Sequence, residues 1–333
     1  MTDVQMTDVM SEISGAASLL RAGELVAFPT ETVYGLGADA TNPRAVASIF
    51  EVKQRPTFDP LIVHVAAADQ ISAIVTDFPK LAQRLAAEFW PGPLTMVLPR
   101  TSAIPDLVTA GLPGVGVRIP DHPVALELLR QAGCPVAAPS ANPFGRISPT
   151  TAQHVRDGLG ERVRWILDGG PCRVGLESTV ISLMDEVPVL LRPGGCAVED
   201  IERVIGQIRR AVADPLQDDS AQPAPGMLSR HYAPRIPLYR VPVHQVAQPI
   251  PGLRCGLLTD GGRSFQGEFS RIEQLSAGSD LPRCATNFFA ALRSLDSAEL
   301  DVIIAHEFPA EGLGIALNDR LARAAAGSHA VLS

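Results

Sequence analysis

The chain of 333 residues has little lysine and no long apolar run. Only Lys53 and Lys80 are lysines, so arginine supplies nearly all of the positive charge. Nowhere do about eighteen uncharged apolar residues follow one another, which excludes a helix that spans a membrane. A formal net charge of −8 opposes general binding to nucleic-acid backbone, because that binding depends on cationic side chains. Lys53 is therefore a position to follow.

Cysteine is also scarce. The five cysteines are odd in number and widely scattered, and they lack the short paired spacing of a zinc site or a redox motif. We interpret them as reduced packing residues. The first basic residue, Arg21, comes after three acidic residues, so the amino terminus lacks the charge pattern of a secretory signal. We therefore expect a protein of the cytoplasm.

The length favours two domains, because 333 residues exceed one typical compact domain. Short apolar runs bounded by Gly, Pro or Asp predict strands at 25–28, 61–65, 95–98, 115–119, 136–138, 165–168, 178–183 and 187–191. Amphipathic patterns predict helices at 10–22, 43–52, 79–89, 123–131, 151–159 and 198–212. The last two strands are close enough for a hairpin, so we predict an α/β fold with a mixed sheet.

Residues 213–237 predict a linker, because they are rich in Pro, Asp, Ser and Gln and have no amphipathic period. Beyond the linker, a smaller α/β unit is predicted from strands at 253–259 and 302–305 and from helices at 284–295 and 313–326. We therefore divide the chain into a first domain at 1–212, the linker at 213–237, and a second domain at 238–333.

The segment PTETVYGLG, residues 29–37, carries more chemistry than a turn needs. Gly, Asn, Asp or Pro suffice to reverse a chain, so a turn does not explain the threonines and the glutamate. A second cluster joins Lys53 and Arg55, just before the strand that contains His64. Lysine and arginine two residues apart can converge on a phosphate, although a solvated basic turn is an equal alternative for this motif alone. His64 in isolation is more simply a core histidine.

Other polar residues lie at the ends or edges of predicted strands. They are Ser140 and Asn142 in PSANP, Arg118 in VGVRIP, Ser178 in ESTV and Arg192 in LLRPGG. A turn would explain Ser140 and Asn142 if they stood alone. Ligands gather at strand ends in open α/β sheets, so these endings together can form one polar basin.

The chain also resembles a known family. The series PTETVYGLG, KQRP followed by PLIVHV, FWPGPLTMVL, VGVRIPDHP, APSANPFGRISPT, ESTVISL and LLRPGG closely resembles the YrdC family of threonylcarbamoyl-AMP synthases. PGMLSRHYAP and GLGIALNDRLARAAA resemble the long form of that family, which has an added carboxyl-terminal domain. The resemblance implies a YrdC-like mixed, twisted open sheet with helices, followed by a smaller Rossmann-like α/β domain.

The resemblance implies a nucleotidyltransferase that converts L-threonine, bicarbonate or carbon dioxide, and ATP to L-threonylcarbamoyl-AMP and pyrophosphate. The product would pass to a tRNA threonylcarbamoyl transferase complex. Both N-carboxy-threonine and ATP are anions, so the site needs cations, fixed donors and exclusion of water. Mg²⁺ is expected to bind together with ATP, because it usually bridges phosphates and keeps several waters.

Site residues are implied by the same resemblance. L-Threonine would lie near Thr32, His64, Arg118, Ala138 and Ser178, with Arg118 as the clamp for its carboxylate. ATP would lie against Lys53, Arg55, Asp59, Gly114, Ser140, Asn142, Ser148, Arg192 and Tyr232. The catalytic residues would be Lys53, Arg55, Ser140 and Asn142. Many relatives have asparagine or histidine in place of Asp59, whose carboxylate would repel phosphate unless magnesium or an adenosine hydroxyl lay between them.

His231 and Tyr232 give the linker an unusual aromatic and basic end. We predict that 213–237 folds over the pocket as a lid, because a carbamoyl-adenylate is a reactive mixed anhydride that must be kept from water. In the simpler alternative, both side chains only pack at the domain interface.

A function of another class is a non-catalytic module that binds double-stranded RNA, which members of the family have been suspected to do. The net charge argues against this function, although a local basic patch would keep it open. A dehydrogenase is set aside, since neither Gly35-x-Gly37 nor 256–262 has the G-x-G-x-x-G spacing. The glycine-rich loop within 253–262 could bind a nucleotide, but a structural cap is the favoured interpretation. Direct contact with tRNA is left open.

Overall fold

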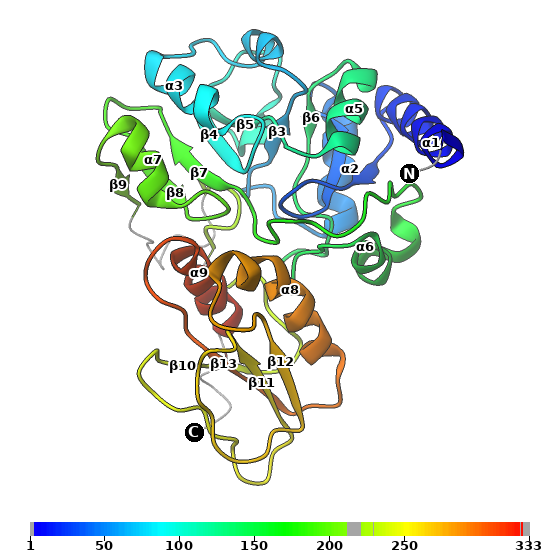
Figure 1. Ribbon diagram of the computed structural model, residues 1–333. Helices are drawn as coiled ribbons and strands as arrows, with labels where there is room; N and C mark the ends of the chain where they lie inside the picture. Colours follow the sequence, from blue (N-terminus) through cyan, green and yellow to red (C-terminus); the bar gives the residue numbers. More distant parts are fainter. Residues whose placement is uncertain (1–2, 212–220, 229, 327, 329–333) are drawn as a thin grey trace.

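The computed structural model describes residues 3–211, 221–228, 230–326 and 328. In this part of the chain, two sheets with their helices lie one above the other in Figure 1. The upper sheet has nine strands in the order β1-β2-β6-β3-β5-β4-β7-β8-β9. The lower sheet has four strands in the order β10-β13-β11-β12. Helices α8 and α9 lie between the two sheets.

The nine-stranded sheet is mixed. Its strands are β1 (Val26–Phe28), β2 (Gly35–Asp39), β3 (Ile62–His64), β4 (Leu94–Pro99), β5 (Gly114–Arg118), β6 (Val136–Ala137), β7 (Thr179–Ser182), β8 (Val189–Arg192) and β9 (Arg209–Arg210). The pairs β3/β5, β4/β7 and β8/β9 are parallel, and the other pairs are antiparallel. The parallel pair β3/β5 sets His64 directly beside Arg118, so the sheet itself brings two predicted site residues together.

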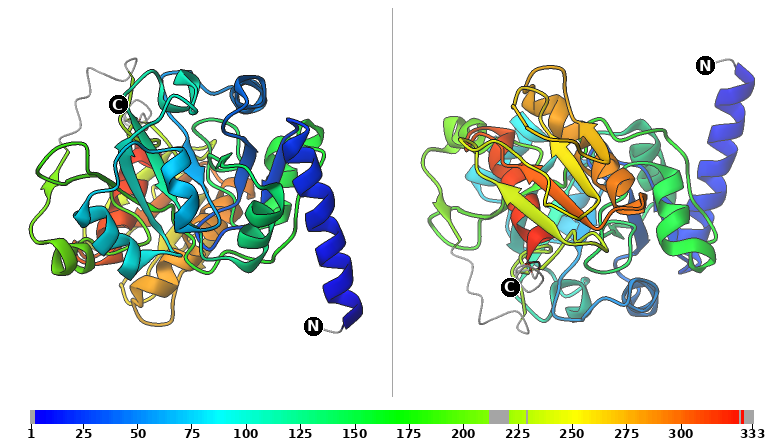
Figure 2. Two further views of the ribbon diagram at one scale, coloured as in Figure 1. Left: turned by 90° about the horizontal axis from the view of Figure 1, so that it is seen from above. Right: turned by 90° about the horizontal axis from the view of Figure 1, so that it is seen from below.

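The helices that accompany this sheet are α1 (Asp3–Arg21), α2 (Pro43–Lys53), α3 (Lys80–Phe89), α4 (Asp106–Thr109), α5 (Pro123–Ala132), α6 (Ala152–Leu159) and α7 (Val198–Ile205), with 3₁₀ turns η1 (Ala68–Ala73) and η2 (Gly160–Arg162). Local sequence fixes several ends. Asn42 caps α2 by accepting bonds from the backbone N–H groups of Arg44 and Ala45, and Pro43 follows at the first helical position. Figure 2 shows α1 at the side of the molecule, where it packs on α5.

The four-stranded sheet is parallel throughout. It contains β10 (Leu238–Val241), β11 (Cys255–Thr259), β12 (Arg271–Gln274) and β13 (Val302–His306), with helices α8 (Leu281–Ser297) and α9 (Leu313–Ala325). A parallel sheet with crossover helices agrees with the predicted Rossmann-like unit. The helices also reach the other half of the molecule, since Val33, Ile147 and Leu176 share one buried cluster with Phe288 and Phe289 of α8. The two halves therefore have a common apolar core.

Most predicted elements are present, and the predicted hairpin is confirmed by the antiparallel pair β7/β8. Two predictions are wrong. Residues 165–168 form no strand in the structure, where Ile166 makes only an isolated bridge with Ala27. The helix expected at 198–212 ends at Ile205, because Gly206 turns the chain with φ of 86° and residues 209–210 then pair with β8.

The predicted linker, 213–237, lies partly outside the described residues, which omit 212–220 and 229. Its described part, at 221–228 and 230–237, contains no helix or strand. It contacts the first half through a bridge between Ala233 and Arg146 and through backbone carbonyl and amide bonds such as Gln222 N–H to the carbonyl of Phe58. All five cysteines are free thiols, and four of them are buried. Among the residues described, none of the helices has the length and apolar character needed to cross a membrane.

Candidate active site

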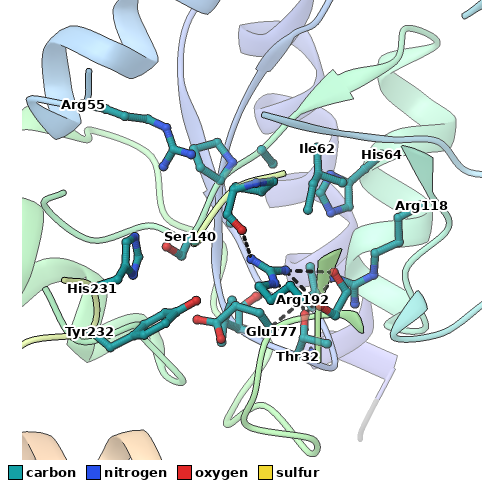
Figure 3. A pocket seen from close by; sticks show the side chains of 18 residues that line it. Thr32, Arg55, Ile62, His64, Arg118, Ser140, Glu177, Arg192, His231 and Tyr232 are labelled. Carbon is teal, nitrogen blue, oxygen red and sulfur yellow. Dashed lines mark hydrogen bonds between the residues drawn. The ribbon is translucent and has the colours of Figure 1, made fainter. Parts of the chain in front are cut away.

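One pocket collects most of the predicted site residues (Figure 3). It is lined by Thr30, Thr32, Val33, Gly35, Arg55, Ile62, His64, Arg118, Ala138, Pro139, Ser140, Glu177, Ser178, Arg192, Pro225, Gly226, His231 and Tyr232. Its volume is about 50 Å³, well below the roughly 300 Å³ at which ligand pockets begin. Because four of the lining residues come from 225–232, the linker region is what narrows the pocket.

The PTETVYGLG segment connects β1 to β2 and forms one wall of this pocket. The hydroxyl of Thr30 accepts bonds from the backbone N–H groups of Thr32 and Val33 and donates to the carbonyl of Val33, so it fixes the turn. The hydroxyl of Thr32 bonds to that of Thr30 and faces the pocket. Gly35 lines the pocket, whereas a Cβ at Gly37 would lie 2.8 Å from the ring of Phe28. Gly35 thus forms part of the pocket wall, whereas Gly37 lets Phe28 pack closely against the backbone.

Arg118 and His64 lie on the right side of the pocket in Figure 3, and Thr32 lies at its lower centre. Its Nη1 donates to the hydroxyl of Thr32 at 2.9 Å, and its Nη2 forms an ion pair with Glu31 Oε1 at 2.7 Å. Arg118 and Glu31 are both buried, so their charges attract each other with little screening by water. A carboxylate ligand could share this guanidinium, which is the only cation in the wall formed by these four residues.

His64 is buried beside Arg118. Burial, followed by the positive charge of Arg118, lowers the pKa of His64 to about 3, so the imidazole is neutral near pH 7. Its Nδ1 has no hydrogen-bond partner within the described part of the protein. A buried imidazole nitrogen without a partner is expected to receive one from a ligand. Beyond these residues, Ala138 lines the pocket, and Ser178 exchanges a hydrogen bond with Thr95 at 2.8 Å.

Two arginines form the other cationic part of the pocket. Arg55 lies 2.9 Å from Asp59 in an ion pair and also donates to the carbonyl of Pro60. Arg192, at the end of β8, donates to the carbonyl of Ser178 at 2.9 Å and to the carbonyl of Pro225 at 2.8 Å. The Pro225 contact joins the linker to a predicted phosphate-binding side chain. An anion that approaches Arg192 would compete with this carbonyl.

Lys53 does not line the pocket but supports it from behind. Its ammonium group donates to the carbonyls of Ser140 and Asn142, each at 2.5 Å. Burial, with a smaller contribution from Arg55, holds the pKa of Lys53 well below its ordinary value. Ser140 reaches the pocket, whereas the amide of Asn142 donates to the carbonyls of Pro143 and Arg146. These contacts fix the conformation of the loop that carries Ser140.

The remaining predicted nucleotide residues have other surroundings. Asp59 is fully buried, which raises the pKa of its carboxyl, while Arg55 opposes this effect. The charge of Asp59 is therefore balanced by an arginine of the site itself. Gly114 lies at the opposite end of β5 from Arg118, and a Cβ there would come within 2.8 Å of Val97. Neither Asp59 nor Gly114 is among the residues that line the pocket.

Sequence reasoning missed three charged residues of this region. Glu31 pairs with Arg118, as described above. Glu177 lines the pocket, accepts a hydrogen bond from Ser148 at 2.5 Å, and forms an ion pair with Arg320 of α9 at 2.7 Å. The two glutamates were visible inside the PTET and ESTV motifs. Arg320 lies 143 residues from Glu177 in the chain, so no local pattern connects the two.

His231 and Tyr232 are buried against the pocket, with their ring centroids 4.2 Å apart. His231 also contacts Phe144 edge-on, and Tyr232 contacts Phe289 of α8. Tyr232 has φ of 60°, a conformation that bulky residues rarely adopt outside functional sites. Within the described residues, its hydroxyl and the Nδ1 of His231 have no hydrogen-bond partner. Both side chains therefore line the pocket, and Tyr232 also contacts the carboxyl-terminal half through Phe289.

Proteins of known family are similar to this chain over nearly its whole length. The family model described as "Telomere recombination" matches residues 18–194, and the model described as "Threonylcarbamoyl-AMP synthase, C-terminal domain" matches residues 196–326. Threonylcarbamoyl-AMP synthase of Bacillus subtilis (strain 168) is 45% identical, with 97% of each chain covered. The enzyme of Pyrococcus abyssi (strain GE5 / Orsay) is 44% identical, with 93% of this chain and 92% of that protein covered.

The fold agrees with a solved structure at similar coverage. The crystal structure of P. abyssi Sua5 complexed with L-threonine matches with a TM-score of 0.87 and 41% identity, over 95% of this chain and 94% of that chain. The chain therefore belongs to the threonylcarbamoyl-AMP synthase family, in the form that has a carboxyl-terminal domain.

Proposed function

We propose that this protein forms L-threonylcarbamoyl-AMP and pyrophosphate from L-threonine, bicarbonate or carbon dioxide, and ATP. The observation that supports this reaction best is a single pocket with two differently built sides. One side offers Arg118, neutral His64 and the hydroxyl of Thr32, and the other offers Arg55 and Arg192. The similar P. abyssi Sua5 has been crystallised with L-threonine, which supports L-threonine as a substrate. We assign the first side to it because Arg118 can bind its carboxylate.

On the threonine side, Arg118 would bind the α-carboxylate through its guanidinium nitrogens, which now contact Thr32 and Glu31. The unpartnered Nδ1 of His64 is available for the threonine hydroxyl. A neutral imidazole suits this role, because a positively charged imidazole would repel the ammonium group of the substrate. The N–H of Ala138 donates to the carbonyl of Ile62, so its carbonyl is the backbone group that remains a candidate for a further contact.

On the nucleotide side, Arg55 and Arg192 would hold the phosphates, and Lys53 would keep the loop of Ser140 in place. The threonine amine first adds to carbon dioxide and loses a proton, which gives N-carboxy-threonine. A carboxylate oxygen of this carbamate then attacks the α-phosphorus of ATP, and the bond to pyrophosphate breaks. Fixed arginines stabilise the charge that develops on the leaving pyrophosphate.

Mg²⁺ enters this proposal as part of the ATP substrate. Among the residues that the structure describes, no group of three or more His, Cys, Asp or Glu side chains could hold a metal ion. The triphosphate itself supplies the oxygen ligands that Mg²⁺ prefers, and water can complete its shell. Magnesium that is bound through the phosphates would need no such group of side chains.

We also propose that the linker is a lid. A pocket of about 50 Å³ cannot contain ATP and threonine together, so residues near 225–232 must move outward when ATP enters. With the substrates bound, His231 and Tyr232 would return toward the nucleotide and exclude water from the mixed anhydride. The packing alternative is partly realised as well, since Tyr232 contacts Phe289 across the interface.

The product is reactive, so an enzyme that transfers its threonylcarbamoyl group should consume it directly. A tRNA threonylcarbamoyl transferase complex in the cytoplasm is the proposed consumer. The double-stranded RNA module is not favoured, because similarity to threonylcarbamoyl-AMP synthases covers nearly the whole chain.

An assay of pyrophosphate release tests the proposal. Release from ATP should depend on L-threonine and on bicarbonate, and omission of either substrate should reduce it to background. Equal release without threonine would overturn the assignment of the amino-acid side. Salt-dependent binding of double-stranded RNA without ATP turnover would favour the alternative function instead.

A further inference from the structure

Arg320 is a charged side chain in the middle of the molecule. It belongs to α9 in the carboxyl-terminal half, is 0% exposed, and shares its buried helix face with Leu317, Leu321 and Ala324. Packing alone does not call for a charge at such a position. A buried ion pair seldom stabilises a fold more than well-packed apolar residues do, because both charges lose their hydration. Arg320 therefore needs another explanation.

The guanidinium of Arg320 contacts three segments that the sequence analysis had separated. Its Nε pairs with Glu177 Oε2 at 2.7 Å, and its Nη2 donates to the carbonyl of Pro193 at 2.9 Å. Its Cζ lies 5.0 Å from the centre of the Tyr232 ring. One residue of the second half thus touches the ESTV segment, the RPGG segment and the linker, each of which supplies side chains to the pocket.

The contact with Glu177 leads to the pocket wall beside Arg192, since Glu177 lines the pocket and the charges of Arg320 and Glu177 both act on Arg192. It also leads to Ser148, which the family resemblance assigns to ATP. Glu177 uses its other oxygen to accept a hydrogen bond from Ser148 at 2.5 Å. Arg320, Glu177 and Ser148 therefore form a buried chain of contacts, with Arg320 and Ser148 on either side of Glu177. The proposed threonine clamp, Arg118, has other partners, since it bonds to Thr32 and Glu31.

We propose that Arg320 is a positioning residue for ATP, supplied by the carboxyl-terminal half, which holds Glu177 and Ser148 in the geometry that the nucleotide requires. This inference rests on the proposed function and deepens it. It gives α9 a part in substrate binding, which the idea of a structural cap does not include. Arg320 itself reaches ATP only through the residues that it orients.

A neighbouring arginine offers a comparison on the same helix. Arg323 pairs with Asp319 at 3.0 Å and donates to the carbonyl of Met227 at 2.7 Å. It therefore holds the linker without contact to Glu177. Asp319 is shared, because its Oδ2 accepts from Nη1 of Arg320 and its Oδ1 accepts from Arg323. A variant at Arg323 should loosen the linker while Arg320 keeps both Asp319 and Glu177, so a larger effect of the Arg320 variant reports the contacts that Arg320 alone makes.

The test uses the full-length protein with Arg320→Met, Arg320→Lys and Arg323→Met. Arg320→Met replaces the charged side chain with an unbranched apolar one. We expect it to raise the KM for ATP at least tenfold. The dissociation constant of L-threonine, measured by calorimetry without ATP, should change less than twofold. Arg320→Lys should restore part of the ATP affinity, because it returns a cation to Glu177. Arg323→Met should raise the KM for ATP less than Arg320→Met does.

A double-mutant cycle asks whether Arg320 acts through Glu177. Glu177→Gln keeps the shape of the side chain and removes its charge, so Arg320→Met added to Glu177→Gln should raise the KM for ATP no further. The exposed Arg283→Met is the control for a lost arginine in the same half. An unchanged KM for ATP in Arg320→Met, or additive effects in the double variant, would overturn the inference. If the unchanged protein shows no threonine-dependent ATP turnover, the proposed function fails, which is a different result.

Discussion

The arginine side chains of the pocket already have protein partners, so a substrate that binds to them must exchange contacts. Arg118 is engaged by Glu31, and Arg192 by the carbonyl of Pro225. Arg55 is engaged by Asp59. Such pairs keep buried charges from being isolated, which would be strongly destabilising. Substitutions in this pocket therefore need controls for the partner that is left behind.

Replacement of Arg118 by alanine tests the carboxylate clamp. We expect a rise of tenfold or more in the KM for threonine, since a charge-assisted hydrogen bond contributes about 1.5–3 kcal/mol. Serine shares the carboxylate and lacks only a methyl group, so its already poorer use should fall by the same factor. Steady-state kinetics with both amino acids measure this. The variant Arg118→Ala/Glu31→Gln removes the unpaired Glu31 charge and is the control for misfolding. Selective rescue of serine would contradict the assigned role.

The burial of His64 leads us to predict that the protein loses stability as the pH falls. An unfolded histidine takes up a proton below about pH 6.5, whereas burial and Arg118 lower the pKa of folded His64 to about 3. Between these values the unfolded state binds more protons, so stability falls as the pH falls. From pH 7 to pH 5, His64 should contribute a loss of about 2 kcal/mol.

Denaturant unfolding at pH 7 and at pH 5 measures that loss in the unchanged protein and in His64→Gln. The variant should lose less stability between the two pH values, by about 2 kcal/mol, because glutamine does not titrate. His154, whose pKa burial lowers to about 4, acts in the same direction and remains in both proteins. The same pH dependence in both proteins would show that His64 is not a buried neutral imidazole.

At the scale of elements, the linker carries the next prediction. His231→Ala/Tyr232→Ala should waste ATP, because water would reach the mixed anhydride when both rings are absent. The measured quantity is ATP consumed per intact threonylcarbamoyl-AMP recovered, and it should rise relative to the unchanged protein. Arg230→Ala, at an exposed neighbouring position, is the matched control. Equal yield and equal activity in all three proteins would eliminate the lid.

Elements with strong local signals could be predicted from the sequence. Helix α2 could be predicted because its apolar face is periodic, and the structure adds that Asn42 caps its start. Strand β2 was not predicted, since GLGAD contains two glycines and little apolar periodicity. The strand exists because Gly37 leaves room for Phe28 and pairs across the sheet with Val26. Tertiary packing overrides local preference there.

The site divides in the same way. Residues inside ordered motifs, such as Arg118 and Arg192, could be assigned to a pocket because strand ends converge. Two supporting contacts could not be predicted, because each joins segments far apart in the chain. They are the contact of Lys53 with the loop of Ser140 and that of Arg320 with Glu177. Such contacts become visible only when the fold places the segments together.

At the scale of the whole molecule, the shared core predicts that both halves unfold together. Phe289→Ala should lower the free energy of unfolding by about 3–5 kcal/mol, since Phe289 is fully buried in the cluster that contains Val33 and Ile147. Both tryptophans, Trp90 and Trp165, lie in the first half, so their fluorescence reports on that half alone. In denaturant unfolding, Phe289→Ala should move the transition seen by tryptophan fluorescence to a lower denaturant concentration. An unshifted tryptophan transition would mean that the two halves unfold independently.

The fate of the carbon from bicarbonate tests the central account most directly. The protein would be incubated with ATP, magnesium, L-threonine and ¹³C-bicarbonate, and the adenylate product would be identified by mass spectrometry. We predict an AMP conjugate that contains threonine and one labelled carbon, formed together with pyrophosphate. Conversion of ATP to AMP or ADP without a labelled threonine conjugate, under conditions in which that conjugate is stable, would contradict the account.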